Sequence, residues 1–378
     1  MSPVAPPLVG EREADVLVLG AGLTGCAAAL ELARRRRRVV VLEAGRVGGG
    51  ASASDLGHVP TGLGLPYTEA VKRLGHAGAR EVWEAHRENQ VRLREFLSEV
   101  GDDCGYRAAG GFLLAADRAE ARALADSEDL LRDDGFPGEF LDHYMLEARF
   151  DVRGFAGAYW SADEAEVDPA RLVEALAGAA AAEGAAIHMA SPVLDLELSS
   201  RGAEAFTAAG RARAPWAIVA LDVQAPRLVP FLEGRVVPLD GLGLVLGTLE
   251  ARALPSPARA HGGRVAWRAE DGSAVLKVVG FGPRPAAGEL EAFVGGGLGM
   301  APQRLDQWRG TAAASADGFP LVGALPGLPA SAACAYGALG QAYALLAARW
   351  VADALLTGHD PTPARFRTGR FESVPHPQ

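Results

Sequence analysis

Cysteine is scarce in this sequence, and its 37 basic residues are outnumbered by 47 acidic ones. The 378 residues include only three cysteines, Cys26, Cys104 and Cys334, with no CxxC pair and no metal-ligand spacing. This scarcity argues against a disulfide framework and a bound metal, and it favours a reducing, cytoplasmic compartment. The formal net charge of −10 indicates no basic surface that would neutralise phosphates, so we do not expect nucleic acid as a partner.

Long uninterrupted apolar runs are also missing. The first run, residues 16–19, is too short for the apolar region of a signal peptide and leads directly into glycines. The C-terminal stretch 335–357 is longer, but Gln341, Arg349 and Asp353 interrupt it, which favours a buried helix over a bilayer span. We therefore expect neither a cleaved leader nor a membrane span.

The N-terminal pattern predicts a βαβ unit. Residues 1–14 are rich in proline and then charged, so we expect a loose tail. Residues 15–19 suit a buried parallel strand, residues 23–30 carry apolar side chains at helical spacing, and residues 39–42 form a second strand. A right-handed crossover places two such strands side by side in one sheet.

Later stretches alternate between helical and β patterns. A long helical region with one apolar stripe is expected over residues 68–97, and Asp168 followed by Pro169 begins another helix. Short strands with a small meander are expected over 187–221. The β-rich pattern over 226–308, broken by glycine and proline, predicts an antiparallel sheet that forms a wall of a ligand site.

A glycine motif lies between the first strand and its helix. Gly20, Gly22 and Gly25 form GxGxxG, which permits a tight turn, close approach of the backbone to a pyrophosphate and close helix packing. Glu43 ends the second strand, 18 residues beyond Gly25, where a carboxylate accepts hydrogen bonds from ribose hydroxyls and disfavours a 2′-phosphate. These features predict a dinucleotide site, and the alternative is a glycine-rich turn in another α/β protein.

Several further segments match a known family in the same order. They are VLVLGAGLTG followed by VVVLEAGRVGGGAS, the helix VDPARLVEAL, then SPVLDLE, WRGTAAASADGFPLVG and the closing GALGQAYALLAARWVADALLTG. In these segments the sequence resembles the D-amino-acid oxidase superfamily of FAD-dependent oxidoreductases, which contains glycine oxidase, monomeric sarcosine oxidase and the gamma-glutamylputrescine oxidases. The resemblance runs over most of the chain and implies FAD as the cofactor.

The resemblance implies an α/β fold of two interleaved domains. A Rossmann-like FAD-binding domain with a parallel sheet would be assembled from residues 1–80, 150–225 and 308–378. An α+β substrate domain with an antiparallel sheet would comprise residues 81–149 and 226–307. The sequence carries no signal for an oligomeric state.

The family also implies which residues hold the cofactor. They come from the GxGxxG turn, the ribose acid and the segment after it, a valine at the adenine end and a late glycine loop near the isoalloxazine ring. In this chain they are Gly20, Ala21, Gly22, Leu23, Thr24, Gly25, Glu43, Ala44, Gly45, Arg46, Ala51, Ser52, Val193, Gly337, Ala338, Leu339, Gly340, Gln341 and Ala342. The branch with covalent flavin uses a cysteine shortly before the aspartate of the DGFP-like segment. The stretch WRGTAAASADG has none, so we expect dissociable FAD.

The family reaction moves a hydride from the carbon that bears the amine to flavin N5, and oxygen then reoxidises the flavin and gives hydrogen peroxide. The cofactor supplies the difficult electronic step, so the protein mainly positions the substrate. The resemblance therefore implies a small-molecule amine or amino-acid substrate. The alternatives are a flavin-dependent dehydrogenase that passes electrons to a quinone or a protein partner, a non-catalytic FAD-binding subunit, and a plain NAD dehydrogenase.

Lys277 and His58 are the candidate catalytic residues. Lys277 interrupts the apolar strand AVLKVVGF, and relatives carry a lysine in a similar strand that promotes reaction with oxygen. The alternative is an edge-strand lysine that prevents aggregation. His58, in GHVPTG, would line the pocket or contact the flavin, and the alternative is a hydrogen-bonded structural histidine. Arg264, Trp267 and Arg268 are candidates for a substrate-carboxylate clamp, with a surface position as the alternative.

The sequence departs from the family pattern at four places. SDLG stands at 54–57 where relatives often have RNGG, ALD stands at 220–222 in place of ATG or ATN, and GQA stands at 340–342 where GHG or similar is usual. Ala344 occupies the position of a substrate-binding lysine in some relatives. A carboxylate on the substrate is therefore not required by this sequence.

Overall fold

The N-terminal βαβ unit forms where the sequence predicts it. The computed structural model describes residues 5–247, 253–270 and 274–371. Strand β2 (Val16–Leu19) runs parallel to β3 (Val39–Leu42), and α1 (Leu23–Arg34) connects them. All residues of both strands are buried, because each face of the sheet that they form is covered.

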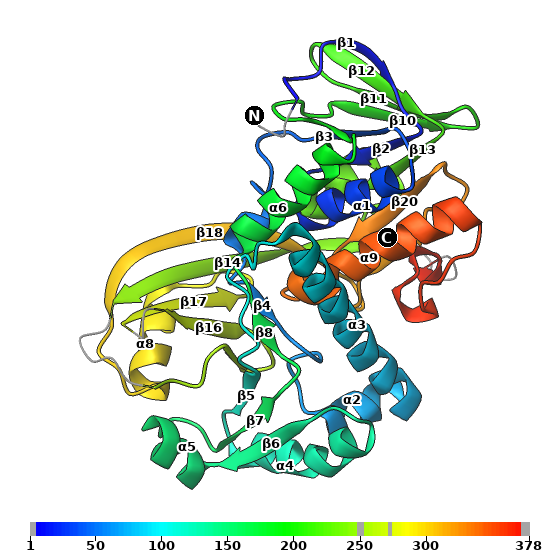
Figure 1. The fold of residues 1–378 in the computed structure, drawn as a ribbon. Helices are drawn as coiled ribbons and strands as arrows, with labels where there is room; N and C mark the ends of the chain where they lie inside the picture. Colours follow the sequence, from blue (N-terminus) through cyan, green and yellow to red (C-terminus); the bar gives the residue numbers. More distant parts are fainter. Residues whose placement is uncertain (1–4, 248–252, 271–273, 372–378) are drawn as a thin grey trace.

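This sheet has six strands in the order β19-β20-β13-β2-β3-β9. Helices α1, α6 and α9 pack on one face, and a four-stranded sheet, in the order β1-β12-β11-β10, covers the other (Figure 1). The further elements of this layer are α6 (Pro169–Ala182), β9 (Ala186–His188), β10 (Asp195–Ser199), β11 (Gly202–Phe206), β12 (Gly210–Ala214), β13 (Trp216–Val219), β19 (Leu321–Ala324), β20 (Ala330–Cys334) and α9 (Gly340–Thr357).

The N-terminal segment is not a loose tail within the described residues. Strand β1 (Gly10–Glu13) pairs in parallel with β12, and Leu8 is only 1% exposed. The backbone N–H of Leu8 donates a hydrogen bond of 2.9 Å to Ser191 Oγ. The sequence-based expectation was wrong because backbone pairing and one buried leucine order a segment that has no apolar periodicity of its own.

An eight-stranded sheet forms the second body. Its order is β18-β14-β17-β16-β15-β5-β7-β6, and α8 packs against one face (Figure 1). Its elements are β5 (Gly111–Ala115), α4 (Arg118–Asp133), β6 (Gly138–Asp142), α5 (His143–Phe150), β7 (Gly157–Ser161), β14 (Val236–Gly247), β15 (Ala258–Ala260), β16 (Val265–Glu270), β17 (Val275–Phe281), α8 (Ala287–Gly297) and β18 (Gln303–Ser315). The predicted antiparallel sheet is present, although β15 pairs in parallel with β5.

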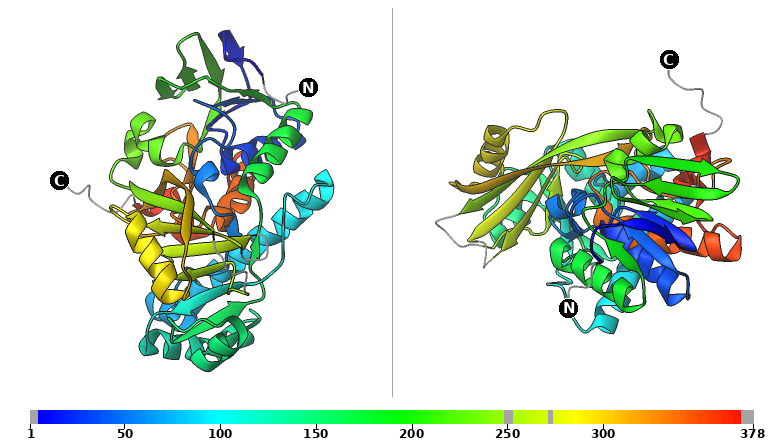
Figure 2. Two further views of the ribbon diagram at one scale, coloured as in Figure 1. Left: turned by 90° about the vertical axis from the view of Figure 1, so that its left-hand side faces the viewer. Right: turned by 90° about the horizontal axis from the view of Figure 1, so that it is seen from above.

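The division between the two bodies differs in detail from the predicted boundaries. Strand β7, which lies in the stretch 150–225, pairs with β5 and β6 in the eight-stranded sheet. Most of β18 also belongs to this sheet, because its register with β14 continues to Ser315. The four-stranded and eight-stranded sheets lie at opposite ends of the molecule (Figure 2).

Two helices replace the single helical region predicted over 68–97. Helix α2 (Tyr67–Leu74) ends at Gly75, and α3 (His76–Val100) begins directly after it. Gly75 has φ 73°, which a side chain disfavours, so glycine allows the chain to change direction here. The predicted start of α6 is confirmed, because the carboxylate of Asp168 accepts hydrogen bonds from the N–H groups of Ala170 and Arg171.

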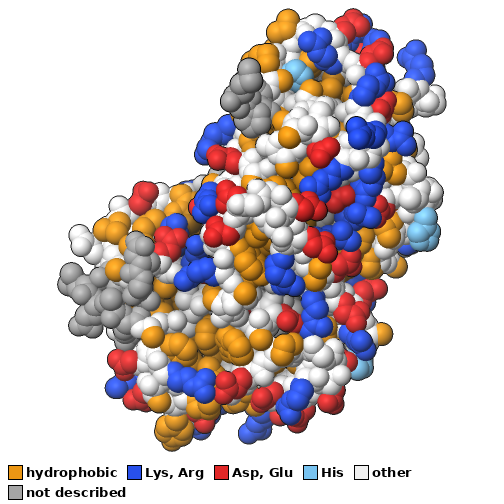
Figure 3. Space-filling view, in the orientation of Figure 1, with side chains coloured by type: hydrophobic (Ala, Val, Ile, Leu, Met, Phe, Trp, Pro, Cys, Tyr) orange, Lys and Arg blue, Asp and Glu red, His pale blue; other side chains and the backbone are white. Residues whose placement is uncertain are grey.

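Helix hydrophobicity and surface charge bear on the environment of the protein. Among the described residues, no helix is both long enough and apolar enough to span a bilayer. On the face seen in Figure 3, acidic and basic side chains are intermingled over both bodies.

Leu8→Ala should lower the free energy of unfolding by about 2 to 5 kcal/mol, because it opens a cavity among core residues at the N-terminal segment. Val9→Ala is the matched control, since Val9 is 67% exposed, and it should change stability by less than about 0.5 kcal/mol. Urea unfolding curves of both variants measure the difference. Equal effects would show that the segment does not pack as described.

Candidate functional site

A cavity of about 660 Å³ runs from the glycine turn of the six-stranded sheet to the wall formed by the eight-stranded sheet. Its volume lies within the range of about 300 to 1,000 Å³ that is typical of ligand sites. Its lining comes from widely separated parts of the chain, namely residues 20–24, 43–46, 49–55, 220–224, 239–241, 279–281, 308–312 and 333–344, although not every residue within these ranges contributes.

The glycine turn is too tight for a side chain at two of its positions, Gly20 and Gly25. A Cβ atom on Gly25 would lie 1.9 Å from the carbonyl oxygen of Gly20, and one on Gly20 would lie 2.5 Å from the carbonyl oxygen of Ala220. Gly20 also has φ 98°. Glycine at these positions therefore lets β2, α1 and the end of β13 meet at one point, and α1 begins at the cavity.

Glu43 is held in position by the same turn. Its Oε2 accepts a hydrogen bond of 2.9 Å from the N–H of Ala21, and its Oε1 accepts one of 2.7 Å from the N–H of Gly45. Each carboxylate oxygen can accept more than one hydrogen bond. The residue therefore lines the cavity with spare acceptor capacity, which suits the two hydroxyls of a ribose.

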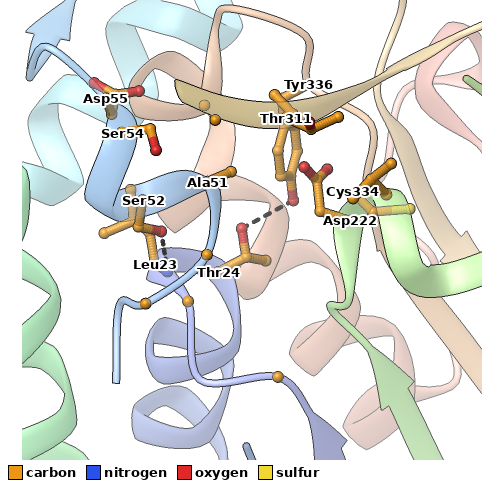
Figure 4. A pocket seen from close by; sticks show the side chains of 18 of the residues that line it. Leu23, Thr24, Ala51, Ser52, Ser54, Asp55, Asp222, Thr311, Cys334 and Tyr336 are labelled. Carbon is orange, nitrogen blue, oxygen red and sulfur yellow. Dashed lines mark hydrogen bonds between the residues drawn. The ribbon is translucent and has the colours of Figure 1, made fainter. Parts of the chain in front are cut away.

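Ser52 reaches across the cavity to the first turn of α1. Its Oγ accepts a hydrogen bond of 3.1 Å from the N–H of Leu23, as the dashed line in Figure 4 shows. A second dashed line joins Thr24 Oγ1 to the hydroxyl of Tyr336, at 3.2 Å. These contacts bring the segment after the ribose acid, and the late loop, to the N-terminus of α1, which is a favourable position for a pyrophosphate.

Asp222 stands just after the end of β13, in the segment ALD. Its φ is 48°, and its two carboxylate oxygens accept hydrogen bonds from the N–H groups of Ala313, at 2.8 Å, and Ala335, at 3.2 Å. Burial raises the pKa of Asp222 to about 6, although the backbone donors oppose the shift. The side chain therefore links the end of β13 to β18 and to the late loop, next to Cys334 (Figure 4).

Asn89 of α3 positions the late loop from behind. Its Nδ2 donates to the carbonyl oxygen of Gln341, at 2.8 Å, and its Oδ1 accepts from the N–H groups of Leu345 and Leu346, at 3.1 and 3.0 Å. The side chain thus inserts into the first turns of α9 and fixes the end of that helix that lines the cavity. Sequence reasoning missed Asn89, although a polar residue among the buried positions of α3 was the available signal.

The wall at the other end of the cavity is mainly apolar. Leu239, Val279, Phe281 and Trp308 line it from β14, β17 and β18. Residues 54–56 pack directly on this wall, since Trp308 Nε1 donates to the carbonyl oxygen of Ser54 at 3.2 Å and Leu56 lies against Val279. The wall therefore provides a place for the hydrocarbon part of a ligand.

Most of the predicted cofactor-binding residues lie together on the cavity. Those that line it are Gly20, Gly22, Leu23, Thr24, Glu43, Ala44, Gly45, Arg46, Ala51, Ser52, Gly337, Ala338, Gly340 and Gln341. Five others are not part of the lining, namely Ala21, Gly25, Val193, Leu339 and Ala342. Ala21 and Gly25 act through the turn itself. Val193 is buried near the start of β10, where its carbonyl oxygen accepts from Arg227 Nη2.

The two predicted catalytic residues do not line the cavity. Lys277 lies on the same face of β17 as the lining residues Val279 and Phe281, but nearer the N-terminal end of the strand. Its Nζ forms an ion pair with Glu270 Oε1 at 2.8 Å. His58 is buried and pairs with Glu164 at 2.7 Å, and burial lowers the pKa of its imidazole. Each of these polar side chains is thus paired with a carboxylate from another part of the fold and does not belong to the lining of the ligand cavity.

The candidate carboxylate clamp is also absent from the cavity lining. Arg268 is directed to the backbone, with its Nη1 donating to the carbonyl oxygen of Val167 at 2.7 Å, and its Nε lies 3.5 Å from Glu166. Arg264 is exposed. Within the described ranges, no three His, Cys, Asp or Glu side chains are grouped so that they would hold a metal ion.

The glycine turn, the ribose acid and the late loop on one continuous cavity define a dinucleotide-binding protein whose ligand extends toward a second, antiparallel sheet. The sequence matches the family model described as FAD dependent oxidoreductase (DAO) over residues 15–354, and the chain belongs to this family. The expected family, the α/β fold class and FAD as the cofactor are thereby confirmed.

Curated relatives agree with this membership. The chain is 30% identical to glycine oxidase of Geobacillus kaustophilus over 57% of its own length and 56% of that protein. It is 29% identical to gamma-glutamylputrescine oxidoreductase of Escherichia coli over 54% of its length and 48% of that protein. These matches span about half the length of the relatives, whereas a 26% identical match to glycine oxidase of Bacillus licheniformis covers 84% of that protein.

Solved structures share the fold over nearly the whole chain. Glycine oxidase from Geobacillus kaustophilus superposes with a TM-score of 0.81 at 23% identity, covering 95% of this chain and 99% of the other. L-proline dehydrogenase from P. horikoshii gives a TM-score of 0.79 at 18% identity, covering 97% and 99%.

The residues present fit FAD. At one end, the close-packed glycine turn, the start of α1 and the spare acceptor capacity of Glu43 suit the ADP half. At the other end, the late loop and the apolar wall leave room for a flat ring system and a substrate.

Glu43→Gln should raise the Kd for FAD about 10- to 100-fold, because it removes the charge from an acceptor that serves two backbone donors and a ribose. Titration of the apoprotein with FAD, followed by flavin fluorescence, measures the change. Glu13→Gln on the exposed strand β1 is the control and should leave the Kd unchanged. An unchanged Kd for FAD in Glu43→Gln would show that the Glu43 carboxylate does not bind the ribose.

Asp222→Asn tests the buried carboxyl through pH. Because the pKa of Asp222 is raised from 3.8 to about 6, the unfolded chain loses this proton first as pH rises. The free energy of unfolding of the wild type should therefore fall relative to that of the variant between about pH 4 and pH 6, and the difference should stay constant above that range. Urea unfolding of the two apoproteins at several pH values measures it, and a flat difference contradicts the assigned burial.

Proposed function

We propose that this protein oxidises the C–N bond of an amine or amino acid, with oxygen as the electron acceptor and hydrogen peroxide as the product. The observation that carries the proposal is the single cavity that connects the dinucleotide turn to the apolar wall of the second sheet. Names of relatives support the substrate class, since they include glycine oxidase and gamma-glutamylputrescine oxidoreductase.

Bound FAD supplies the acceptor for the hydride that leaves the substrate carbon. The chain's own residues position the reactants. Glu43 and the start of α1 would hold the ADP half, and residues 337–341 would border the flavin. Helix α9 begins at Gly340, at the cavity, and the positive end of its dipole favours negative charge at that place.

The apolar wall has the second task. Val279, Phe281 and Trp308 would exclude water from the reacting carbon and hold it against the cofactor. We give no proton-transfer step to Lys277 or His58, because each is already paired with a carboxylate outside the cavity lining.

Two further features belong to this proposal. The FAD should dissociate, since the stretch before Asp317 has no cysteine for a covalent bond. All three cysteines are buried and free, which supports a reducing, cytoplasmic location.

Anaerobic reduction of the flavin tests the function directly. The purified holoprotein should lose its flavin absorption when mixed with one class of D- or L-amino acids, N-methyl amino acids or polyamines. Admission of air should then restore the absorption quickly and release peroxide. Slow recovery in air would show that oxygen is not the electron acceptor. If no amine bleaches a flavin that dithionite does reduce, the proposed oxidation of C–N bonds is refuted.

A further inference from the structure

A single acidic side chain lies where the cavity meets the apolar wall. Asp55 lines the cavity, and its neighbours in the sequence, Ser54 and Leu56, pack on Trp308 and Val279 of the wall. Asp55 Oδ1 accepts a hydrogen bond of 2.6 Å from the N–H of Gly57. Its position at the upper left of Figure 4 is separated from Asp222 by the width of the cavity.

The second carboxylate oxygen of Asp55 faces the start of α9. A Cβ atom on Gly340 would lie 3.9 Å from Asp55 Oδ2, which places this oxygen close to the first residue of α9. A side-chain hydrogen bond from Gln341 also lowers the pKa of the Asp55 carboxyl.

The amide oxygen of Gln341 has no partner in the described part of the chain. Gln341 is 3% exposed and lines the cavity, and its Oε1 is a buried acceptor without a hydrogen bond. A buried polar atom of this kind is expected to receive a donor, here from a ligand. Asp55 and Gln341 thus each bring an acceptor oxygen to the lining of the cavity, and two such acceptors suit a group with several N–H donors and a positive charge.

The same end of the cavity has no basic side chain that would pair with a carboxylate, within the described lining. Among the described lining residues only Arg46 and Arg309 are basic. Arg46 follows the ribose acid at the ADP end. Arg309 pairs with Leu242, so it lies on the opposite face of β18 from Trp308, and it is exposed. The first turns of α9 present Gly340 and Ala344, which carry no charge.

Three basic residues elsewhere on this face of the described sheet are already paired, whereas Arg264, opposite Phe281, is exposed. Lys277 pairs with Glu270, and Arg268 lies beside Glu166. Arg259, on β15, binds Glu164 at 2.6 Å. The carboxylate of Asp55 takes part in none of these three ion pairs.

We propose that Asp55 and Gln341 bind the ammonium group of an alkylamine substrate, and that this acceptor pair selects such amines over amino acids that carry a carboxylate on the reacting carbon. The apolar wall holds the hydrocarbon chain. This inference rests on the proposed function and narrows its substrate class.

Titration of Asp55 gives the proposal a pH signature. Burial raises the pKa of Asp55 to about 6, opposed by the Gly57 N–H and the Gln341 side chain, and no charged group contributes to the shift. The carboxyl is thus ionised above about pH 6, and a bound cation stabilises that form. Affinity for an alkylammonium ion should fall as pH decreases through 6, although the amine itself stays protonated.

Binding can be separated from catalysis by a pair of compounds that cannot be oxidised. tert-Butylamine and 2-aminoisobutyrate both lack a hydrogen on the carbon that bears nitrogen, and they differ by the exchange of one methyl for a carboxylate. In the holoprotein, tert-butylamine should perturb the oxidised flavin spectrum with a Kd at least about tenfold below that of 2-aminoisobutyrate. Asp55→Asn should raise the Kd of the amine about 10- to 100-fold and abolish its dependence on pH near 6.

Asp240→Asn is the matched control. Asp240 is exposed on β14, hydrogen-bonded to Thr311, and is not among the cavity-lining residues, so the same loss of charge there should leave the Kd unchanged. Melting temperature and FAD content check that both variants are folded and loaded. If 2-aminoisobutyrate binds as tightly as tert-butylamine, or Asp55→Asn leaves the amine Kd unchanged, the inference is overturned. A variant that loses FAD affinity instead identifies Asp55 as a flavin contact and also overturns it.

Oxidisable pairs distinguish this inference from the proposed function. Putrescine and ornithine differ by one carboxylate, as do n-butylamine and norvaline. Reduction of the flavin by the amines, at lower concentrations than by the amino acids, supports both ideas. Reduction by the amino acids alone leaves the function standing and refutes the inference. Reduction by neither, with tight binding of tert-butylamine, refutes the function and leaves the binding site standing.

Discussion

Close backbone contact at the glycine turn is the constraint on which the rest of this structure depends. Neither Gly20 nor Gly25 has room for a Cβ atom, because carbonyl oxygens lie 2.5 and 1.9 Å from where it would be. This contact brings β2, α1 and the end of β13 together within one turn. Two consequences follow: α1 begins at the cavity, and β13 delivers Asp222 into it.

Hydrogen bonds from side chains to backbone carry this geometry to the rest of the site. Asp222 links β13 to β18 and the late loop, and Asn89 joins α3 to the start of α9. These hydrogen bonds join residues that are at least 91 positions apart in the sequence, so no local sequence pattern predicts them. The hydrogen bonds of Asn89 are buried and those of Asp222 are partly buried. Loss of one partner would leave an unsatisfied polar group, so these bonds as well as packing hold the late loop in place.

The sequence predicted what depends on neighbours along the chain and missed what depends on neighbours in space. The βαβ unit and the Asp168 cap follow from local periodicity and capping chemistry, and both are present. Strand β1 was missed because its stability comes from pairing with β12. Lys277 lies on the anticipated strand and on the face of Val279, yet Glu270 on β16 neutralises it. Strand register decides that pairing, and no property of the lysine segment reveals it.

Asp55 and Asp222 show how one physical condition gives two different roles. Burial raises the pKa of both to about 6, and neither has a cation among the causes of its shift. Both carboxylate oxygens of Asp222 accept hydrogen bonds from backbone N–H groups, so this side chain serves to join β13 to β18 and to the late loop. Asp55 accepts a hydrogen bond from Gly57 with one oxygen, and its other oxygen lies near the start of α9, where Gln341 Oε1 has no partner in the described part of the chain. A desolvated carboxylate with open acceptor capacity costs folding free energy, and a fold retains such a group where a ligand supplies the missing donor.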